Sequence, residues 1–385
     1  MPINVLADAN IPELLHYLGA GVTVRTFQGR LLGRDDLDAV DALLVRSVTP
    51  VGEALLQGSS VKFVGTATSG FEHVDRAWLK QAGIAFAHAP GSNANSVVEY
   101  VLAAIAEDDH RLENLFSGGR VGVVGFGHVG RALVRRLEAL GIRYVCYDPW
   151  LEPASIPNRV EWDELLRSDV VSLHCELTTQ APWPSCHLIG EVELRGMSAQ
   201  SLLINASRGD VIDSAALQRA LLAGSAPRTV LDVWEGEPAI SADLLQKVFI
   251  GTPHVAGYSL DGKVLATAML CSAMRATLDI SDSAPQPPLP AMSAVCVDTA
   301  VEGVSLMRTL LRQSYDILRD DALLREALLG ADPAQARLRF DELRRNYRPR
   351  RELAGRQVFA GELSAEDRRL VEALGCSLVE NAGTT

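Results

Sequence analysis

The chain has 385 residues, of which 48% are hydrophobic and 22% are charged, and its formal net charge is −12. This is the composition of a globular protein that is long enough for two or three domains. The negative charge argues against a general nucleic-acid-binding surface and is expected mostly to aid solubility. Six cysteines are scattered without any C-x-x-C pair. They predict reduced thiols in a cytoplasmic protein, and neither a disulfide framework nor a metal site.

The N-terminal residues, MPINVLADAN, begin a strand directly. We find no basic segment followed by an apolar run, which would mark a signal peptide, and no apolar stretch near about 18 residues. The sequence therefore predicts no secretion signal and no contact with a membrane.

Residues 1–95 alternate short apolar strands with helical segments, which is the rhythm of a parallel sheet. In open α/β sheets ligands bind at the carboxyl ends of strands, although Gly, Pro, Asn and Ser also form ordinary turns. Polar loops follow three of the predicted strands, at 46–49, 65–70 and 90–95. The predicted strands are 3–7, 42–45, 62–64 and 84–87, and the predicted helices are 11–18, 52–57 and 76–81.

The segment 121–148 carries a G-x-G-x-x-G turn between a predicted strand and a predicted helix. An acid, Asp148, follows the first glycine by about 20 residues, which is the context that a dinucleotide-binding turn requires. Asp148 would accept hydrogen bonds from a ribose 2′-OH and repel a 2′-phosphate, so the segment predicts NAD rather than NADP. The alternative is a glycine-rich turn without a ligand. The candidate cofactor residues are Gly125, Gly127, His128, Val129, Gly130 and Asp148.

After residue 148 the chain continues to alternate strands and helices, and beyond the linker it becomes mostly helical. A helix is predicted over 96–116, and a second series of strands follows at 169–174, 202–205 and 229–233, with a helix at 214–222. A helix at 268–280 and a proline-rich linker at 283–290 come next. The last part reads as an α+β domain with helices at 301–318, 333–347 and 365–374, and strands at 357–360 and 377–379.

Three segments place polar residues after apolar strands, at 206–210, 231–238 and 251–258. Hydride transfer from an alcohol requires a base for the hydroxyl proton and a cation for a neighbouring carboxylate. Histidine suits the first task, and the planar fork of arginine suits the second. A carboxylate beside the histidine stabilises its charged form. His254, Arg208 and Glu237 can fill these roles, but spacing alone does not bring them together, and a histidine after a strand is often structural.

Four motifs occur in order at family-like separations: GFGHVG, NASRGDVID, LDVWEGEP and TPHVAGYS. Together they resemble the D-isomer-specific 2-hydroxyacid dehydrogenase family. Further stretches, among them VRSVT, KFVGTATSGFEHVD, PGSNANSVVEYV and the C-terminal YDILRDDALLREAL, are similar to a branch that acts on a phosphorylated 2-hydroxy acid. The resemblance covers nearly the whole chain.

This resemblance implies an α/β protein with three domains: a flavodoxin-like substrate domain formed by 1–95 and 253–283, a Rossmann-type NAD domain at 96–252, and a C-terminal α+β domain at 291–385 that makes a homodimer. It implies His254 as acid/base, Glu237 as its partner and Arg208 as the carboxylate anchor. Ser47, Thr68 and Tyr258 match substrate-contact positions. Further cofactor positions are Cys175, Ala206, Ser207, Arg208, Asp232 and Gly257.

The sequence departs from the family at Cys175-Glu176, where relatives usually have Thr-Pro, and in the loop 178–189. Seven arginines crowd into 337–351. We expect a dimer to bring one of them to a partner's cleft, where it binds phosphate together with Arg46. The alternative is a solvated basic face paired with Asp341 and Glu342.

Two other functions compete with this interpretation. One is a different enzyme of the family, acting on 3-phosphoglycerate or glyoxylate. The other is an NAD-sensing scaffold or corepressor that keeps the fold for partner binding. The C-terminal domain argues against both.

Overall fold

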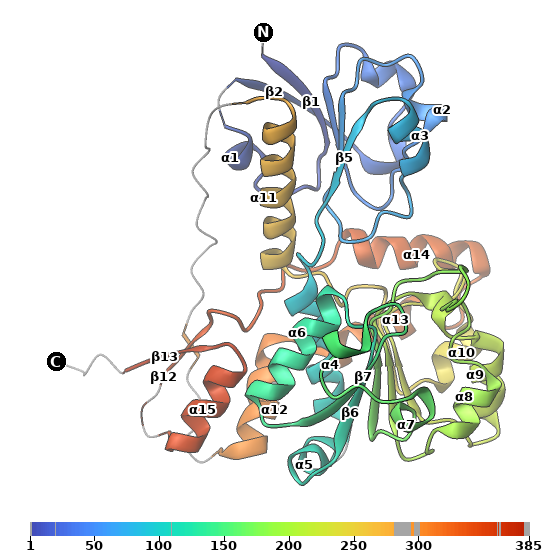
Figure 1. Cartoon of the computed structure of the whole chain (residues 1–385), viewed down its shortest axis with the longest axis vertical. Coiled ribbons are helices and arrows are strands. Elements are labelled where there is room, and N and C mark those ends of the chain that lie inside the picture. Colours follow the sequence, from blue (N-terminus) through green and yellow to red (C-terminus); the bar gives the residue numbers. More distant parts are fainter. Residues whose placement is uncertain are drawn as a thin grey trace. The chain divides into compact units, whose positions relative to one another are not determined.

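The computed structural model describes residues 2–19, 21–108, 110–280, 294–295, 301–359, 361 and 363–380. The predicted linker at 283–290 lies outside these residues. The chain divides into two compact units, shown in Figure 1. Unit 1 is Met1–Asn93 with Ser259–Ala291, and unit 2 is Ala94–Tyr258 with Met292–Thr385. The C-terminal region thus belongs to the same unit as the predicted NAD domain.

Unit 1 is built on a five-stranded parallel sheet with the order β2-β1-β3-β4-β5. This is the flavodoxin-like order, as the sequence predicted. Strand β2 was not predicted, because it is a half-exposed edge strand without a continuous apolar run. The elements are β1 (Ile3–Asp8), α1 (Leu14–Leu18), β2 (Val22–Phe27), β3 (Ala42–Val45), α2 (Glu53–Leu56), β4 (Phe63–Thr66), α3 (Arg76–Gln81), β5 (Ala85–His88) and α11 (Leu260–Thr277).

Helices cover both faces of this sheet, and the alternation along β3 shows how. Ala42 and Leu44 pack into a cluster with residues of α1 and α11. Leu43 and Val45 point to the opposite face, into a cluster with residues of α2 and α3. Helix α11 begins at Leu260 rather than at 268, because the side chain of Ser259 caps it by accepting a hydrogen bond from the backbone N–H of Gly262.

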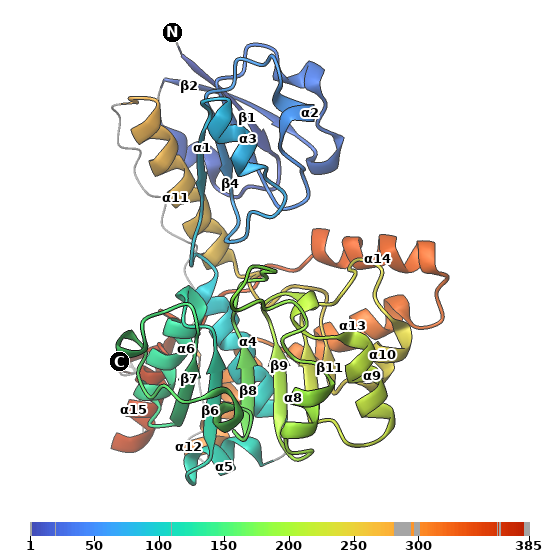
Figure 2. The same ribbon diagram turned by 45° about the vertical axis from the view of Figure 1, so that its right-hand side comes forward.

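Unit 2 contains a six-stranded parallel sheet with the order β11-β10-β9-β8-β6-β7. Its strands β7, β6, β8 and β9 lie side by side in Figure 2. Beyond β7, where a Rossmann sheet has one more strand, Cys146 and Arg159 form a single parallel bridge. The elements are α4 (Ala94–Glu107), α5 (Arg111–Phe116), β6 (Arg120–Val124), α6 (His128–Ala139), β7 (Arg143–Tyr147), α7 (Trp162–Leu165), β8 (Val170–Leu173), α8 (Glu191–Gly196), β9 (Leu202–Asn205), α9 (Ser214–Leu222), β10 (Arg228–Leu231), α10 (Ala242–Lys247) and β11 (Ile250–Gly251).

The C-terminal region adds helices and a two-stranded parallel sheet, so the predicted α/β fold with an α+β C-terminal region is confirmed. The predicted helix at 301–318 is two helices, because Tyr315 is extended and Asp316 caps the second one through the N–H of Arg319. The predicted helix at 96–116 is also two helices, with His110 at φ 59° before the second. The elements are α12 (Gly303–Ser314), α13 (Ile317–Leu328), α14 (Pro333–Arg345), β12 (Gln357–Phe359), α15 (Ala365–Ala373) and β13 (Ser377–Val379).

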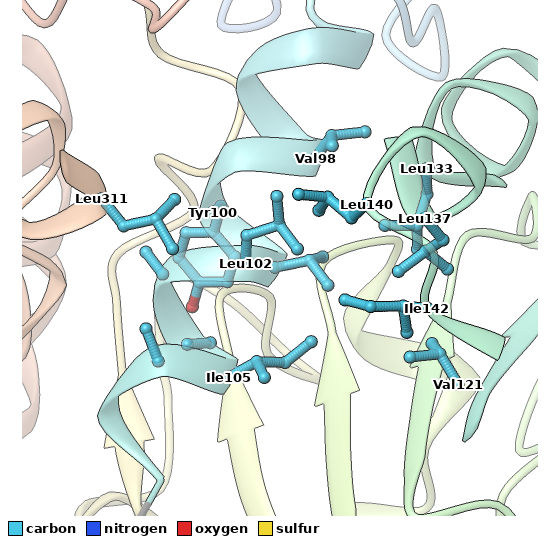
Figure 3. Close-up of a cluster of buried hydrophobic side chains, with 14 of the residues drawn as sticks. Val98, Tyr100, Leu102, Ile105, Val121, Leu133, Leu137, Leu140, Ile142 and Leu311 are labelled. Atoms are coloured by element: carbon cyan, nitrogen blue, oxygen red, sulfur yellow. The ribbon is translucent and has the colours of Figure 1, made fainter. Parts of the chain in front are cut away.

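Helix α4 is the centre of the largest core of unit 2 (Figure 3). It packs against both α6 and α12, and its side chain Tyr100 is fully buried. Leu137 of α6 and Leu311 of α12 belong to the same buried cluster. Each such buried side chain contributes roughly 1.5–3 kcal/mol of hydrophobic stabilisation. The C-terminal region is therefore joined to the dinucleotide fold through a shared core.

Candidate active site

The predicted catalytic and cofactor residues of unit 2 lie in loops that follow strands of one parallel sheet. Because the strands are parallel, their carboxyl ends meet at one edge, which is where open α/β sheets bind ligands. Six loops gather there: 125–130 after β6, 148–150 after β7, 174–176 after β8, 206–208 after β9, 232–237 after β10 and 252–258 after β11.

The turn 125–130, which we call the dinucleotide turn, has the steric features that a bound pyrophosphate requires. Gly125 has φ +90°, and a Cβ there would lie 2.6 Å from the backbone N of Cys175. A Cβ on Gly130 would lie 2.0 Å from the carbonyl O of Gly125, so helix α6 approaches the turn too closely for any side chain. A Cβ on Gly127, by contrast, would meet no protein atom within 4 Å. The space beside Gly127 is therefore open, and the absence of a side chain there allows a phosphate to approach the backbone closely.

Asp148 is fixed beside this turn. Its carboxylate oxygens accept hydrogen bonds from the backbone N–H groups of Phe126, at 2.9 Å, and Trp150, at 3.0 Å. A carboxylate has about four lone-pair sites, so it can still accept from a ribose hydroxyl. A cavity of about 600 Å³ lies here. It is lined by the dinucleotide turn, by Asp148 and by residues of the loop that the sequence left uninterpreted, including Trp183. These residues fit a dinucleotide.

The loop after β9 is held by Asn205, a fully buried residue that the sequence interpretation did not single out. Its side-chain oxygen accepts from the backbone N–H and the hydroxyl of Ser207, and its amide donates to the carbonyl of Arg208 at 2.9 Å. A Cβ on Gly209 would lie 2.0 Å from the carbonyl carbon of Trp234. The Arg208 loop therefore packs directly against the loop that carries Glu237.

His254 and Glu237 meet, although the sequence could not establish this. The Nδ1 of His254 lies 2.5 Å from Oε1 of Glu237, and the two side chains are 30% and 24% exposed. Burial acts to raise the pKa of the Glu237 carboxyl, but His254 and Arg344 outweigh burial and hold that pKa below its ordinary value. The ionised carboxylate only accepts, so Nδ1 carries the proton and Nε2 is the nitrogen left for a substrate.

The segment 252–258, which we call the His254 loop, is organised by the buried carboxylate of Asp232. It accepts from the hydroxyl of Thr252 at 2.6 Å and from the N–H groups of Val255 at 2.7 Å and Ala256 at 2.9 Å. Burial raises the pKa of this carboxyl despite these hydrogen bonds. The side chain of Asp232 is only 1% exposed, so in this structure it orders the loop, and its expected contact with the cofactor stays a prediction.

The C-terminal region also reaches the His254 loop. Arg350 donates to the carbonyl of Ala256 at 2.6 Å and to the hydroxyl of Ser96. Arg344 donates to the hydroxyl of Tyr258 at 3.3 Å. The density of arginines at 337–351 was the only signal in the sequence, and it could not say which of them arrive here or that they do so within one chain.

The remaining predicted residues of unit 2 also lie in these loops. Ala206 follows β9, and Gly257 lies in the turn whose closing hydrogen bond joins the Tyr258 N–H to the Val255 carbonyl. Cys175 lines the cavity, and burial raises the pKa of its thiol to about 12, so the thiol stays protonated. His128 begins helix α6, with Val129 after it.

Three predicted substrate residues belong to unit 1. Arg46 and Ser47 follow β3, with Ser47 exposed and Arg46 partly buried. Thr68 follows β4, and its hydroxyl donates to the carbonyl of Gly70 at 2.7 Å. All three thus lie at the carboxyl ends of strands in their own sheet, where ligand contacts are expected.

The described part of the chain shows neither a metal site nor a membrane-spanning helix. No group of three or more His, Cys, Asp or Glu side chains there is arranged to hold a metal ion. No helix among the same residues has the length and apolar character needed to span a bilayer.

Comparison with known families gives two matches. Residues 92–256 match the D-isomer specific 2-hydroxyacid dehydrogenase, NAD binding domain, and residues 287–375 match a domain of unknown function (DUF3410). The cofactor of the dinucleotide site is accordingly NAD. When bound, NAD supplies a hydride acceptor at the edge of the sheet, and the dinucleotide turn and Asp148 would hold it.

Two kinds of relative agree with these matches. The chain is similar to a glyoxylate reductase from Paecilomyes thermophila (TM-score 0.59, 24% identity, 74% of this chain and 98% of that one) and to D-lactate dehydrogenase from Aquifex aeolicus complexed with NAD and lactic acid (TM-score 0.58, 22% identity, 72% and 95%), which supports the fold. It is 43% identical to erythronate-4-phosphate dehydrogenase of Cellvibrio japonicus over 97% of this chain and 99% of that one, and 42% identical to that of Pseudomonas syringae pv. syringae over 98% and 100%. The chain belongs to the erythronate-4-phosphate dehydrogenase family, within the D-isomer-specific 2-hydroxyacid dehydrogenases.

Proposed function

We propose that this protein oxidises 4-phospho-D-erythronate to (R)-3-hydroxy-2-oxo-4-phosphooxybutanoate with NAD, a step of pyridoxine 5′-phosphate (vitamin B6) biosynthesis. The observation that carries the proposal is the 2.5 Å contact between His254 and Glu237 at the sheet edge that also holds the dinucleotide turn. Full-length similarity to relatives named for this activity supports the choice of substrate.

In the proposed reaction, Nε2 of His254 takes the proton of the C2 hydroxyl as the C–O single bond becomes a carbonyl. NAD, held by the dinucleotide turn and Asp148, would supply the acceptor for the C2 hydride. Glu237 stabilises the charged histidine and fixes its ring orientation. Arg208 anchors the substrate carboxylate with its planar fork. In the reverse direction the protonated histidine returns the proton to the carbonyl oxygen.

Substrate contacts are proposed for Tyr258 and, from unit 1, for Arg46, Ser47 and Thr68. Cys175, Ala206, Ser207, Asp232 and Gly257 are proposed to contribute to the cofactor site with the dinucleotide turn and Asp148. We further propose that unit 1 acts as the substrate domain, that the region 291–385 makes a homodimer, and that the enzyme works in the cytoplasm. Size-exclusion chromatography with light scattering checks the dimer.

A direct test follows NADH fluorescence with purified protein and three acids: 4-phosphoerythronate, 3-phosphoglycerate and glycerate. We expect turnover with 4-phosphoerythronate at a kcat/KM well above that for the other two. Preference for 3-phosphoglycerate would replace the substrate proposal with another enzyme of the family. No turnover with any acid, while NADH still binds, would favour an NAD-sensing scaffold.

A further inference from the structure

Arg344 extends from the last turn of α14 to the end of the His254 loop. Its Nη2 lies 3.3 Å from the hydroxyl of Tyr258, and its guanidinium carbon is 5.9 Å from the centre of that ring. Tyr258 is held in turn by Tyr347, whose ring packs edge-on at 5.8 Å. The guanidinium thus stands beside a residue only four positions after the catalytic histidine candidate.

The charge of Arg344 has no ion pair in the described structure. Other arginines of the C-terminal region do: Arg308 pairs with Glu113, and Arg312 with Glu107. Arg344 is partly buried, and its Nε is buried without a hydrogen-bond partner among the described residues. Removing a cation from water without an anion is costly, so a guanidinium kept in this state is suited to receive an anionic ligand.

The positive charge of Arg344 acts on Glu237, the proposed partner of His254. This charge contributes, after that of His254, to holding the pKa of Glu237 below its ordinary value. The hydrogen bond to Tyr258 places the cation at the His254 loop, rather than on the outer face of α14. An anion bound at Arg344 would therefore lie close to the reacting part of a substrate.

We propose that Arg344 binds the phosphate of the substrate, in the same chain as His254, and determines specificity for a phosphorylated acid. This inference rests on the proposed function. A substrate with a carboxylate and a phosphate requires two cationic contacts, and Arg208 is proposed for the carboxylate. A planar guanidinium can donate two parallel hydrogen bonds to a phosphate, which a lysine cannot reproduce.

Contacts within the same chain hold Arg344 in position. Helices α13 and α14 pack against each other, and Phe340 of α14 is fully buried in the core of unit 2. Beyond the helix, Arg350 ties the segment to the carbonyl of Ala256. For Arg344 the contact with Tyr258 lies within one chain, and the expectation that a dimer brings another arginine to a partner's cleft stays a prediction.

The test compares Arg344→Ala and Arg344→Lys with Arg345→Ala, an exposed neighbour on the same helix. For each protein kcat/KM is measured with 4-phosphoerythronate and with unphosphorylated erythronate. We expect Arg344→Ala to lower the value for the phosphorylated acid by roughly 100-fold, as expected from loss of a charged hydrogen bond, and to lower the value for erythronate by no more than about 10-fold, since Tyr258 and Glu237 lose a neighbouring charge in both reactions. For 4-phosphoerythronate, the kcat/KM of Arg344→Lys should lie between those of Arg344→Ala and the wild type, and the kcat/KM of Arg345→Ala should equal that of the wild type.

A second readout uses inorganic phosphate as the probe. Its binding, followed by calorimetry in the presence of NADH, should weaken at least about 10-fold in Arg344→Ala and stay unchanged in Arg345→Ala. If the wild type does not oxidise 4-phosphoerythronate, the proposed function fails, and this measurement alone decides whether Arg344 is an anion site. Equal losses with both acids, or unchanged phosphate binding in Arg344→Ala, would overturn the inference.

Discussion

The dinucleotide turn and the His254 loop lie at the same edge of one sheet, yet they are built in different ways. The turn is held mainly by residues of 125–148: a Cβ on Gly130 would meet the carbonyl of Gly125, and Asp148 accepts from the N–H of Phe126. The His254 loop is held by Asp232, which follows β10, and also by residues far along the chain, namely Tyr100 through Thr252 and Arg350 from the C-terminal region.

Because the two regions are supported by different residues, we expect cofactor binding at the turn and proton transfer at His254 to respond to different substitutions. A change at His254, or at the supports of its loop in α4 and the C-terminal region, should alter proton transfer more than dinucleotide binding, whereas a change at the turn should do the opposite. Four substitutions test the separation.

The largest effect is expected from His254→Asn. Asparagine tolerates the left-handed backbone of this position, where φ is 55°, so the loop should keep its shape. Loss of the acid/base should lower kcat by about 10²–10⁴-fold, measured as NADH production from 4-phosphoerythronate. The dissociation constant of NADH, measured by fluorescence, should stay within a factor of two or so. A variant that kept full activity would remove His254 from the mechanism.

Asp148→Ser tests the other side of the comparison. It removes the carboxylate proposed to accept from the ribose hydroxyl, and with it the negative charge that repels a 2′-phosphate. KM for NAD should rise about 10–100-fold while NADP becomes a better substrate, and kcat at saturating NAD should change little. Asp163→Ser, which alters an exposed carboxylate in α7, is the control. Unchanged discrimination between NAD and NADP would contradict the role of Asp148.

Arg350→Lys tests whether the C-terminal region holds the His254 loop. Arg350 is 4% exposed, and its guanidinium bridges Ser96 and the carbonyl of Ala256. A lysine keeps the charge but not the fork, so we expect kcat to fall about 10-fold and stability to fall by about 1–3 kcal/mol, with NADH affinity unchanged. Arg345→Lys should show neither loss. If NADH binding weakened as much as kcat, the two regions would not be separate.

The same contrast explains what the sequence could predict. The dinucleotide turn, the parallel strands and the catalytic candidates were predicted, because each depends on a contiguous pattern or a motif. Sequence patterns did not reveal the edge strand β2, whose exposed alternation lacks an apolar run, or the break at Tyr315, which depends on the cap at Asp316. The contacts of Arg344 and Arg350 also escaped, because they join segments about 90 residues apart, and one arginine in a cluster resembles the next.

The smallest effect is expected from Glu99→Gln, which tests the buried contact between α4 and Leu353 of the C-terminal region. Glu99 is 1% exposed on α4, accepts from the N–H of Leu353 at 2.6 Å, and has one oxygen without a partner in the described structure. Burial, and then the nearby charge of Glu352, raises its pKa from 4.5 to about 8, although Arg350 opposes this shift. The folded protein therefore keeps this proton up to about pH 8, whereas the unfolded chain releases it near pH 4.5.

The sign of the pH dependence follows from this. Unfolding releases a proton between these two pH values, so the stability due to Glu99 is complete below pH 4.5 and is lost as the pH rises towards about 8. A neutral glutamine still accepts from Leu353 but does not titrate. Between pH 6 and pH 7 the unfolding free energy of the wild type should fall by about 1 kcal/mol relative to Glu99→Gln, measured by urea titration. The unfolding free energy of Glu366→Gln, an exposed change on α15, should depend on pH in the same way as that of the wild type. Because the folded protein keeps Glu99 protonated over this pH range, the kcat and the NADH affinity of the wild type should run parallel to those of Glu99→Gln.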